Sequence, residues 1–106
     1  MTTEELVETF IQVGREALIK HTSKRCLEIR KLIRKEPVMI DGNEYNCLQE
    51  LVVYKVAEEI RTILPECKIE VILDGNDSIL NMTLTDEERE KLMSYMYVFL
   101  HKNKCL

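Results

Sequence analysis

The chain has 106 residues, of which 45% are apolar and 32% are charged, and its formal net charge is −4. These values are typical of one folded domain (residues 1–106) and exclude a disordered chain. No apolar run approaches the roughly 18 residues that a membrane span needs. The N-terminus, Met1–Glu5, is acidic where a secretory signal would be basic, so we expect a cytoplasmic protein that contacts no membrane.

Charge is strongly segregated along the chain. Residues 14–35 carry eight basic and two acidic side chains, a balance of +6. Residues 36–90 carry 14 acidic and four basic side chains, a balance of −10. The near-neutral total therefore hides a dipolar molecule, and such asymmetry is typical of an interaction surface.

The first helix is predicted to start at Thr2 or Thr3. Thr2 and Glu5 form a capping box, in which each side chain can satisfy a free backbone N–H of the other residue. Apolar residues then follow at the spacing of one helical face: Leu6, Phe10, Val13 and Ala17.

The length of this helix has two interpretations. No Pro or Gly occurs from 15 to 36, so one helix could span residues 3–35 and be about 50 Å long. A domain of this size has a diameter of only about 30 to 35 Å. Either the helix breaks near His21-Thr22-Ser23, which we favour, or a partner covers the part that projects.

A first β-hairpin is predicted after Pro37, which ends the helical region. Val38–Ile40 and Glu44-Tyr45 flank Asp41-Gly42-Asn43. Asp-Gly between apolar residues is a strong hairpin signal, because Gly accepts the positive φ of a tight turn. We expect Asn46 to cap the helix that follows.

That helix is predicted over residues 47–64, with Gln49 three residues after the cap and Pro65 as its stop signal. A second hairpin follows. Residues 68–73 and 78–84 alternate polar and apolar side chains over much of their length, and residues 74–77 (Asp-Gly-Asn-Asp) form the turn between them.

The two Asp-Gly-Asn segments lie 33 residues apart. They could mark a diverged hairpin–helix repeat, or two independent uses of one good turn sequence. We favour the second interpretation, because the distance from turn to following helix differs between the two. The fold class predicted from these elements is α+β, in the order α-α-ββ-α-ββ-α. Its two antiparallel β-hairpins could join into one four-stranded sheet, packed with three to four helices.

A basic helix over residues 20–35 is the main candidate binding surface. It could neutralise phosphates, dock on an acidic protein, or simply be solvated. No aromatic residue occurs between residues 11 and 44 to stack on bases, and the rest of the chain is acidic, so docking on a protein is favoured over nucleic acid. The candidate residues are Lys20, Lys24, Arg25, Arg30, Lys31 and Arg34.

The last helix, residues 86–102, starts with a second capping box formed by Thr85 and Glu88. Six apolar or amphipathic residues in a row, from Tyr95 to Leu100, cannot all face one core. The helix is therefore either sandwiched between other elements or forms a dimer or partner surface on one side. The residues predicted to form that interface are Tyr95, Met96 and Phe99.

The chain offers little for catalysis or metal binding. The four cysteines contain no Cys-x-x-Cys pair and are predicted to be reduced thiols. His101 and Cys105 could share a helix face, but they are a single pair of ligands in a terminal segment. No Gly-rich phosphate loop occurs. We therefore expect no catalytic residues, no metal and no cofactor.

These observations predict a small, non-enzymatic interaction or regulatory protein, homodimeric, that binds a protein partner through the basic helix and the Tyr/Met-rich C-terminal helix. The alternative is a nucleic-acid-binding protein that uses the basic helix 20–35. The small size and lone domain would suit a viral or phage accessory protein, although no residue specifies that origin.

Overall fold

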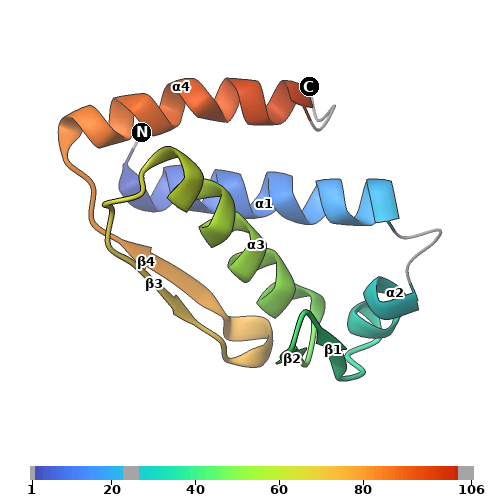
Figure 1. Cartoon of the computed structure of the whole chain (residues 1–106). Helices are drawn as coiled ribbons and strands as arrows, with labels where there is room; N and C mark the ends of the chain where they lie inside the picture. Colours follow the sequence, from blue (N-terminus) through green and yellow to red (C-terminus); the bar gives the residue numbers. More distant parts are fainter. Residues whose placement is uncertain (1, 23–26, 103–106) are drawn as a thin grey trace.

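One central helix, α3 (Leu48–Ile63), contacts most of the other elements. The computed structural model describes residues 2–22 and 27–102. Helix α3 crosses α1, while α4 lies along α1 and runs in the same direction (Figure 1). The elements in chain order are α1 (Thr3–Thr22), α2 (Leu27–Ile33), β1 (Val38–Ile40), β2 (Asn43–Tyr45), α3 (Leu48–Ile63), β3 (Ile69–Ile72), the 3₁₀ turn η1 (Gly75–Asp77), β4 (Ile79–Met82) and α4 (Asp86–Lys102). This order confirms the predicted α+β fold. None of the helices in the described ranges is both long and apolar enough to span a membrane.

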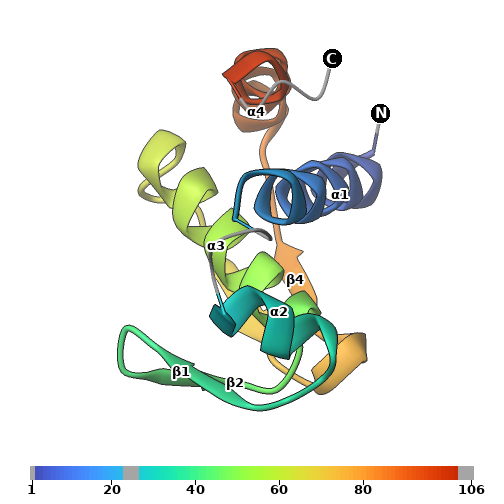
Figure 2. The same cartoon turned by 90° about the vertical axis from the view of Figure 1, so that its right-hand side faces the viewer.

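The predicted break in the first helical region is confirmed. Helix α1 ends at Thr22 and α2 begins at Leu27. Helix α2 does not continue the axis of α1 but lies beside β1 and β2 (Figure 2). The described structure measures 39 × 28 × 21 Å along its principal axes, so a single helix of about 50 Å would have projected beyond it.

The first hairpin has the predicted tight turn. Strands β1 and β2 are antiparallel, with Ile40 opposite Asn43. The two residues between them, Asp41 and Gly42, have φ values of 51° and 83°. Positive φ at both positions is what a type I′ turn requires, and this turn matches the twist of the two strands.

The second hairpin has a wider connection. Strands β3 and β4 pair with Ile72 opposite Ile79, and η1 lies between them. The buried Ser78 side chain closes this turn: its Oγ accepts from the Asp74 N–H (2.9 Å) and donates to the Gly75 carbonyl (2.7 Å). Asp74 has a φ of −142°, whereas Asp41 has a positive φ. The same tripeptide therefore forms two different turns. This difference favours two independent uses of one turn sequence over a diverged hairpin–helix repeat. The hairpins form two separate two-stranded sheets, not one four-stranded sheet.

Two of the three predicted helix caps form. The Glu5 N–H donates to Thr2 Oγ1 (3.1 Å), and Thr85 and Glu88 exchange both bonds of the second capping box (3.0 and 3.2 Å). The prediction for Asn46 is wrong. The N-cap of α3 is Cys47, whose side chain makes no capping bond.

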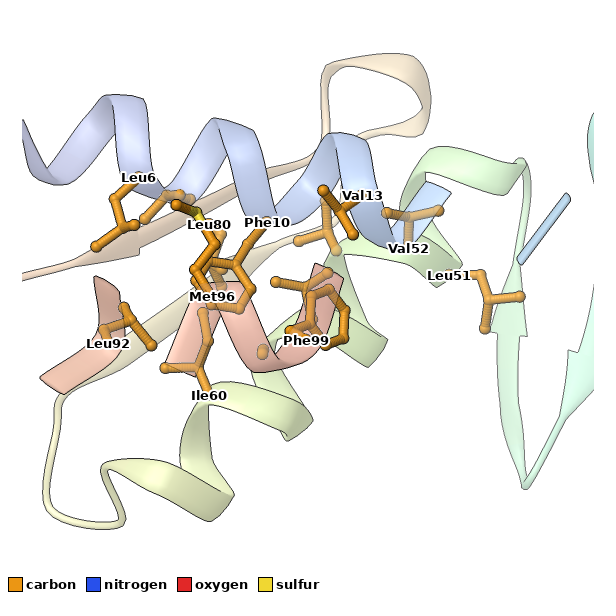
Figure 3. Close-up of a cluster of buried hydrophobic side chains, with 14 of the residues drawn as sticks. Leu6, Phe10, Val13, Leu51, Val52, Ile60, Leu80, Leu92, Met96 and Phe99 are labelled. Carbon is orange, nitrogen blue, oxygen red and sulfur yellow. The ribbon is translucent and has the colours of Figure 1, made fainter. Parts of the chain in front are cut away.

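The core lies between α1, α3, α4 and the inner face of β4. Figure 3 shows Phe10 of α1 close to Met96 and Phe99 of α4 and to Ile60 of α3. The Phe10 and Phe99 ring centroids are 5.3 Å apart. Helices α1 and α3 approach closely at Gly14, where an added Cβ would lie 2.8 Å from Val56 Cγ2. The absence of a side chain at residue 14 therefore sets the distance between these two helices.

A buried carboxylate joins α3 to both hairpins. Glu50 lies in the first turn of α3 and is only 3% exposed. Its Oε2 accepts from the Asn46 backbone N–H (2.7 Å), just after β2, and its Oε1 accepts from the Gly75 backbone N–H (2.9 Å) in η1. Nearby, Gln49 accepts from Arg15 (3.1 Å) and donates to the Ser78 carbonyl (3.4 Å). The start of α3 is therefore tied to the residue that follows the first hairpin and to the turn of the second.

We predict that Glu50→Ala lowers the free energy of unfolding by about 2 to 4 kcal/mol, because two backbone N–H groups lose their charged acceptor. Glu50→Gln should be affected less, since its carbonyl oxygen can keep one bond. Urea unfolding followed by circular dichroism measures both. The control is Glu58→Ala on the same helix, which removes only an exposed ion pair to Lys55 (3.7 Å) and should change stability by less than about 1 kcal/mol. Equal effects of the alanine variants would contradict this role for Glu50.

Candidate interaction surfaces

Helix α2 presents a mixed basic and apolar face to solvent. Ile29 and Leu32 are buried against the rest of the structure. The opposite face carries exposed residues at helical spacing, and Leu27 among them is 64% exposed. Ile33, at the edge of this face, is 47% exposed. We call this set the α2 surface: Leu27, Arg30, Lys31, Ile33 and Arg34.

The end of α2 is defined by a non-glycine residue in the left-handed region. Lys35 has a φ of 62° and donates its N–H to the Leu32 carbonyl (2.9 Å). The Glu36 N–H donates to the Lys31 carbonyl (2.8 Å), which completes a Schellman motif. Arg34 and Glu36 form an ion pair (3.4 Å) on the surface, where such a pair contributes little stability.

The structure brings together only part of the predicted basic set. Arg30, Lys31 and Arg34 share the α2 surface, whereas Lys20 belongs to the last turn of α1. The basic residues predicted on one helix over 20–35 therefore belong to two helices. Lys20 lies on α1 and Lys31 on α2, and Lys35 follows the end of α2. The predicted binding residues Lys24 and Arg25 lie outside the residues that the structure describes.

The predicted interface on α4 is mostly core. Met96 is 5% exposed and Phe99 8%, and both pack in the main hydrophobic cluster (Figure 3). Tyr95 is half-buried and packs against the same cluster. These residues therefore stabilise this chain rather than form an open surface. Among the side chains of this segment that the structure describes, the large exposed apolar ones are Tyr97 and Val98.

Tyr95 links α4 to α3 through a hydrogen bond. Its hydroxyl donates to a carboxylate oxygen of Glu59. This hydrogen bond, together with burial of the ring, raises the pKa of Tyr95 to about 12. The phenol is thus neutral over the physiological range, and its role is to hold two helices together.

The surroundings of the two cysteines that the structure describes, Cys47 and Cys67, favour a structural role for their thiols. Cys47 is buried and Cys67 is half-buried, and both are free. Burial, and then the nearby Glu88 carboxylate, raise the pKa of the Cys67 thiol, which disfavours the nucleophilic thiolate. Within residues 2–22 and 27–102, no three His, Cys, Asp or Glu side chains are grouped as metal ligands. The predicted pair of His101 and Cys105 cannot be placed, because Cys105 is outside the described ranges.

Sequence reasoning missed a groove between α1 and β4. Its volume is about 920 Å³, and its walls are one side of α1 and residues Ser78 to Met82. The two walls are more than 60 residues apart in the sequence, so no local pattern predicts that they meet. One feature of the sequence could have drawn attention to the strand wall of this groove: no charged residue occurs from Ser78 to Leu84, in a chain that is 32% charged.

Comparisons with protein-family models, with curated proteins and with solved structures find no match for this chain. Proposals about its function therefore rest on the residues and their arrangement.

We predict that Met96→Asp unfolds the chain, because it places a charge in the core at a cost of about 4 kcal/mol or more. Tyr97→Asp, one residue further along α4, should leave the fold intact because Tyr97 is 63% exposed. Circular dichroism and size-exclusion chromatography of both variants measure this difference. A folded, soluble Met96→Asp monomer derived from a dimeric wild type would instead restore Met96 as an interface residue.

Tyr95→Phe should lower the free energy of unfolding by about 1 kcal/mol at neutral pH, through loss of the bond to Glu59. The pKa of Tyr95 is raised in the folded state, so its contribution is fully present below pH 10. It is lost as the pH rises from about 10 towards 12. Wild type and Tyr95→Phe should therefore converge in stability over that range, as measured by urea unfolding at each pH. A difference that stays constant to pH 12 would contradict this assignment.

Proposed function

We propose that this chain is a small, non-enzymatic protein-binding module that docks its α2 surface on an acidic partner protein. The observation that carries the proposal is Leu27, a large apolar side chain that is 64% exposed on the same helix face as Arg30 and Lys31. A single exposed leucine is common on proteins. Here, Ile33 lies beside this face and cations lie around it, a combination that suits an apolar contact with a charged rim.

The charge of α2 also favours an acidic partner. Residues 27–35 carry four basic side chains and one acidic side chain, whereas residues 36–90 have a balance of −10. Opposite charges on two proteins steer their encounter and reject partners with the wrong charge. The apolar residues would then supply contact area once the two surfaces meet.

Binding of nucleic acid is the second candidate, and the exposed cations of α2 favour it. Phosphate contacts need cations but no apolar groups, so this function leaves the exposure of Leu27 without a role. The described α2 surface also carries no aromatic side chain for base stacking. We therefore rank it below protein binding.

A homodimer is retained as a separate proposal with a different surface. Tyr97 and Val98 are exposed on α4 and are the residues of the Tyr/Met-rich segment that a second copy could cover. Docking of α2 on the acidic part of another copy would be a head-to-tail contact, which produces rings or open filaments instead of a simple pair. Sedimentation of the wild type tests for self-association directly.

We predict that Lys31→Glu/Arg34→Glu weakens binding to a labelled amphipathic peptide of Glu and Leu by about tenfold or more, because attraction becomes repulsion. The matched control is Lys68→Glu/Lys91→Glu, which changes the charge equally at exposed sites on β3's flank and α4. Fluorescence anisotropy measures the affinity. Equal losses in the two double variants would show a general charge effect and would contradict a role for the α2 surface.

Leu27→Ala separates the two candidate functions. It should weaken binding to the peptide and leave stability unchanged, since Leu27 is largely exposed. Duplex DNA, single-stranded DNA and RNA serve as competing probes at about 50 mM and about 200 mM salt. Tight nucleic-acid binding that falls by orders of magnitude with salt, depends on Lys31 and Arg34, and ignores Leu27 would favour the second candidate.

A further inference from the structure

The groove between α1 and β4 presents the edge of a strand. Successive side chains of a strand point to opposite faces, so a cavity on one face is lined by alternate residues. This groove is lined by every residue from Ser78 to Met82 and by none of β3. It therefore borders the edge of β4 that lies away from β3. Figure 2 shows β4 running beneath α1, in agreement with this arrangement.

That edge is available for pairing. Within the part of the chain that the structure describes, β4 pairs with β3 alone. Proteins usually protect such edges with lysine, proline or a bulge, because unpaired N–H and C=O groups recruit other strands. From Ser78 to Leu84 the chain has neither a charge nor a proline, whereas β3 is flanked by Lys68 and contains Glu70. The strand itself therefore carries neither of these two protections, and α1 lies across the groove from its edge without pairing to it.

The opposite wall of the groove, on α1, carries three glutamates and one cation, Arg15, which donates to Gln49 (3.1 Å). Glu4, Glu5 and Glu8 are exposed on α1 and line the groove. None of these three carboxylates forms an ion pair with another described residue. Each wall also contributes a half-buried apolar side chain, Ile11 from α1 and Met82 from β4. The groove thus combines a backbone edge, apolar side chains on both walls and an α1 wall on which acidic side chains outnumber basic ones.

We propose that this groove binds an extended, basic segment of a partner protein, which adds as a third strand to β4. Main-chain hydrogen bonds to a free edge provide affinity for any extended segment, and the side chains along the groove provide specificity. Alternate apolar residues of the segment would face Ile11 and Met82, and lysine or arginine would face Glu4, Glu5 and Glu8. The charge of the wall therefore selects a basic occupant.

A second copy of this chain fits the groove less well. Pairing of β4 with β4 of another copy would bring two identical acidic walls to one interface, in a chain whose net charge is already −4. The groove is also separate from the α2 surface, which lies beyond the far end of α1 (Figure 1). Failure of either proposal therefore leaves the other intact.

The probe is a labelled peptide of alternating Lys and Val, with a Glu and Val peptide of equal length as its counterpart. We expect the basic peptide to bind wild type and the acidic one not to bind. Glu4→Lys/Glu8→Lys should weaken binding of the basic peptide by about tenfold or more. The matched control is Glu87→Lys/Glu90→Lys, which makes the same charge change in the first turns of α4 and should alter affinity less than about twofold. Lys31→Glu/Arg34→Glu should not weaken binding.

Hydrogen exchange of the bound complex gives a second readout that does not depend on any variant. Amides between residues 78 and 83 that exchange freely in the unbound protein should become protected by the basic peptide. The proposal is overturned if the basic peptide does not bind at low salt, if both double Glu variants weaken it equally, or if protection appears elsewhere. Protection of the same amides in a peptide-free dimer would assign the groove to a second copy instead.

Discussion

The buried carboxylate of Glu50 determines where both hairpins lie. Each of its oxygens accepts a backbone N–H from a different hairpin, one at Asn46 and one at Gly75. A buried carboxylate is costly without partners, so the fold satisfies Glu50 only when both segments return to the start of α3. The two hairpins share no strand pairing with each other. Helix α3 is therefore their common reference, and Glu50 is the contact that connects them.

The position of β4 follows from this arrangement. The turn at Gly75 is held at the start of α3, and Gln49 also reaches the Ser78 carbonyl at the beginning of β4. Leu80 faces inwards to the core beside α1 (Figure 3), while the free edge of the strand borders the groove. The close approach of α1 and α3 at Gly14 places the other wall. Contacts that stabilise the fold thus also define a surface suited to an extended ligand.

The two candidate surfaces differ in the chemistry they offer. The α2 surface is basic and partly apolar, and suits side-chain contacts with an acidic protein. The groove is concave and acidic, and adds main-chain hydrogen bonding. The two proposals therefore assign partners of opposite charge, or two regions of one dipolar partner, to two separate surfaces.

Local sequence signals determined the elements of this protein, because caps, tight turns and periodicity act over a few residues. Thr85 with Glu88, the turn at Asp41-Gly42 and the order of helices and strands were all predictable. Only the tertiary structure decided which residues became core. The sequence cannot tell whether apolar residues such as Met96 and Phe99 lie in a core or in an interface. Their burial depends on how α4 packs against α1 and α3. The same holds for Glu50 and for the groove between α1 and β4, since each joins segments that are distant in the chain. Such contacts depend on how whole faces pack together, and no short stretch of sequence encodes that packing by itself.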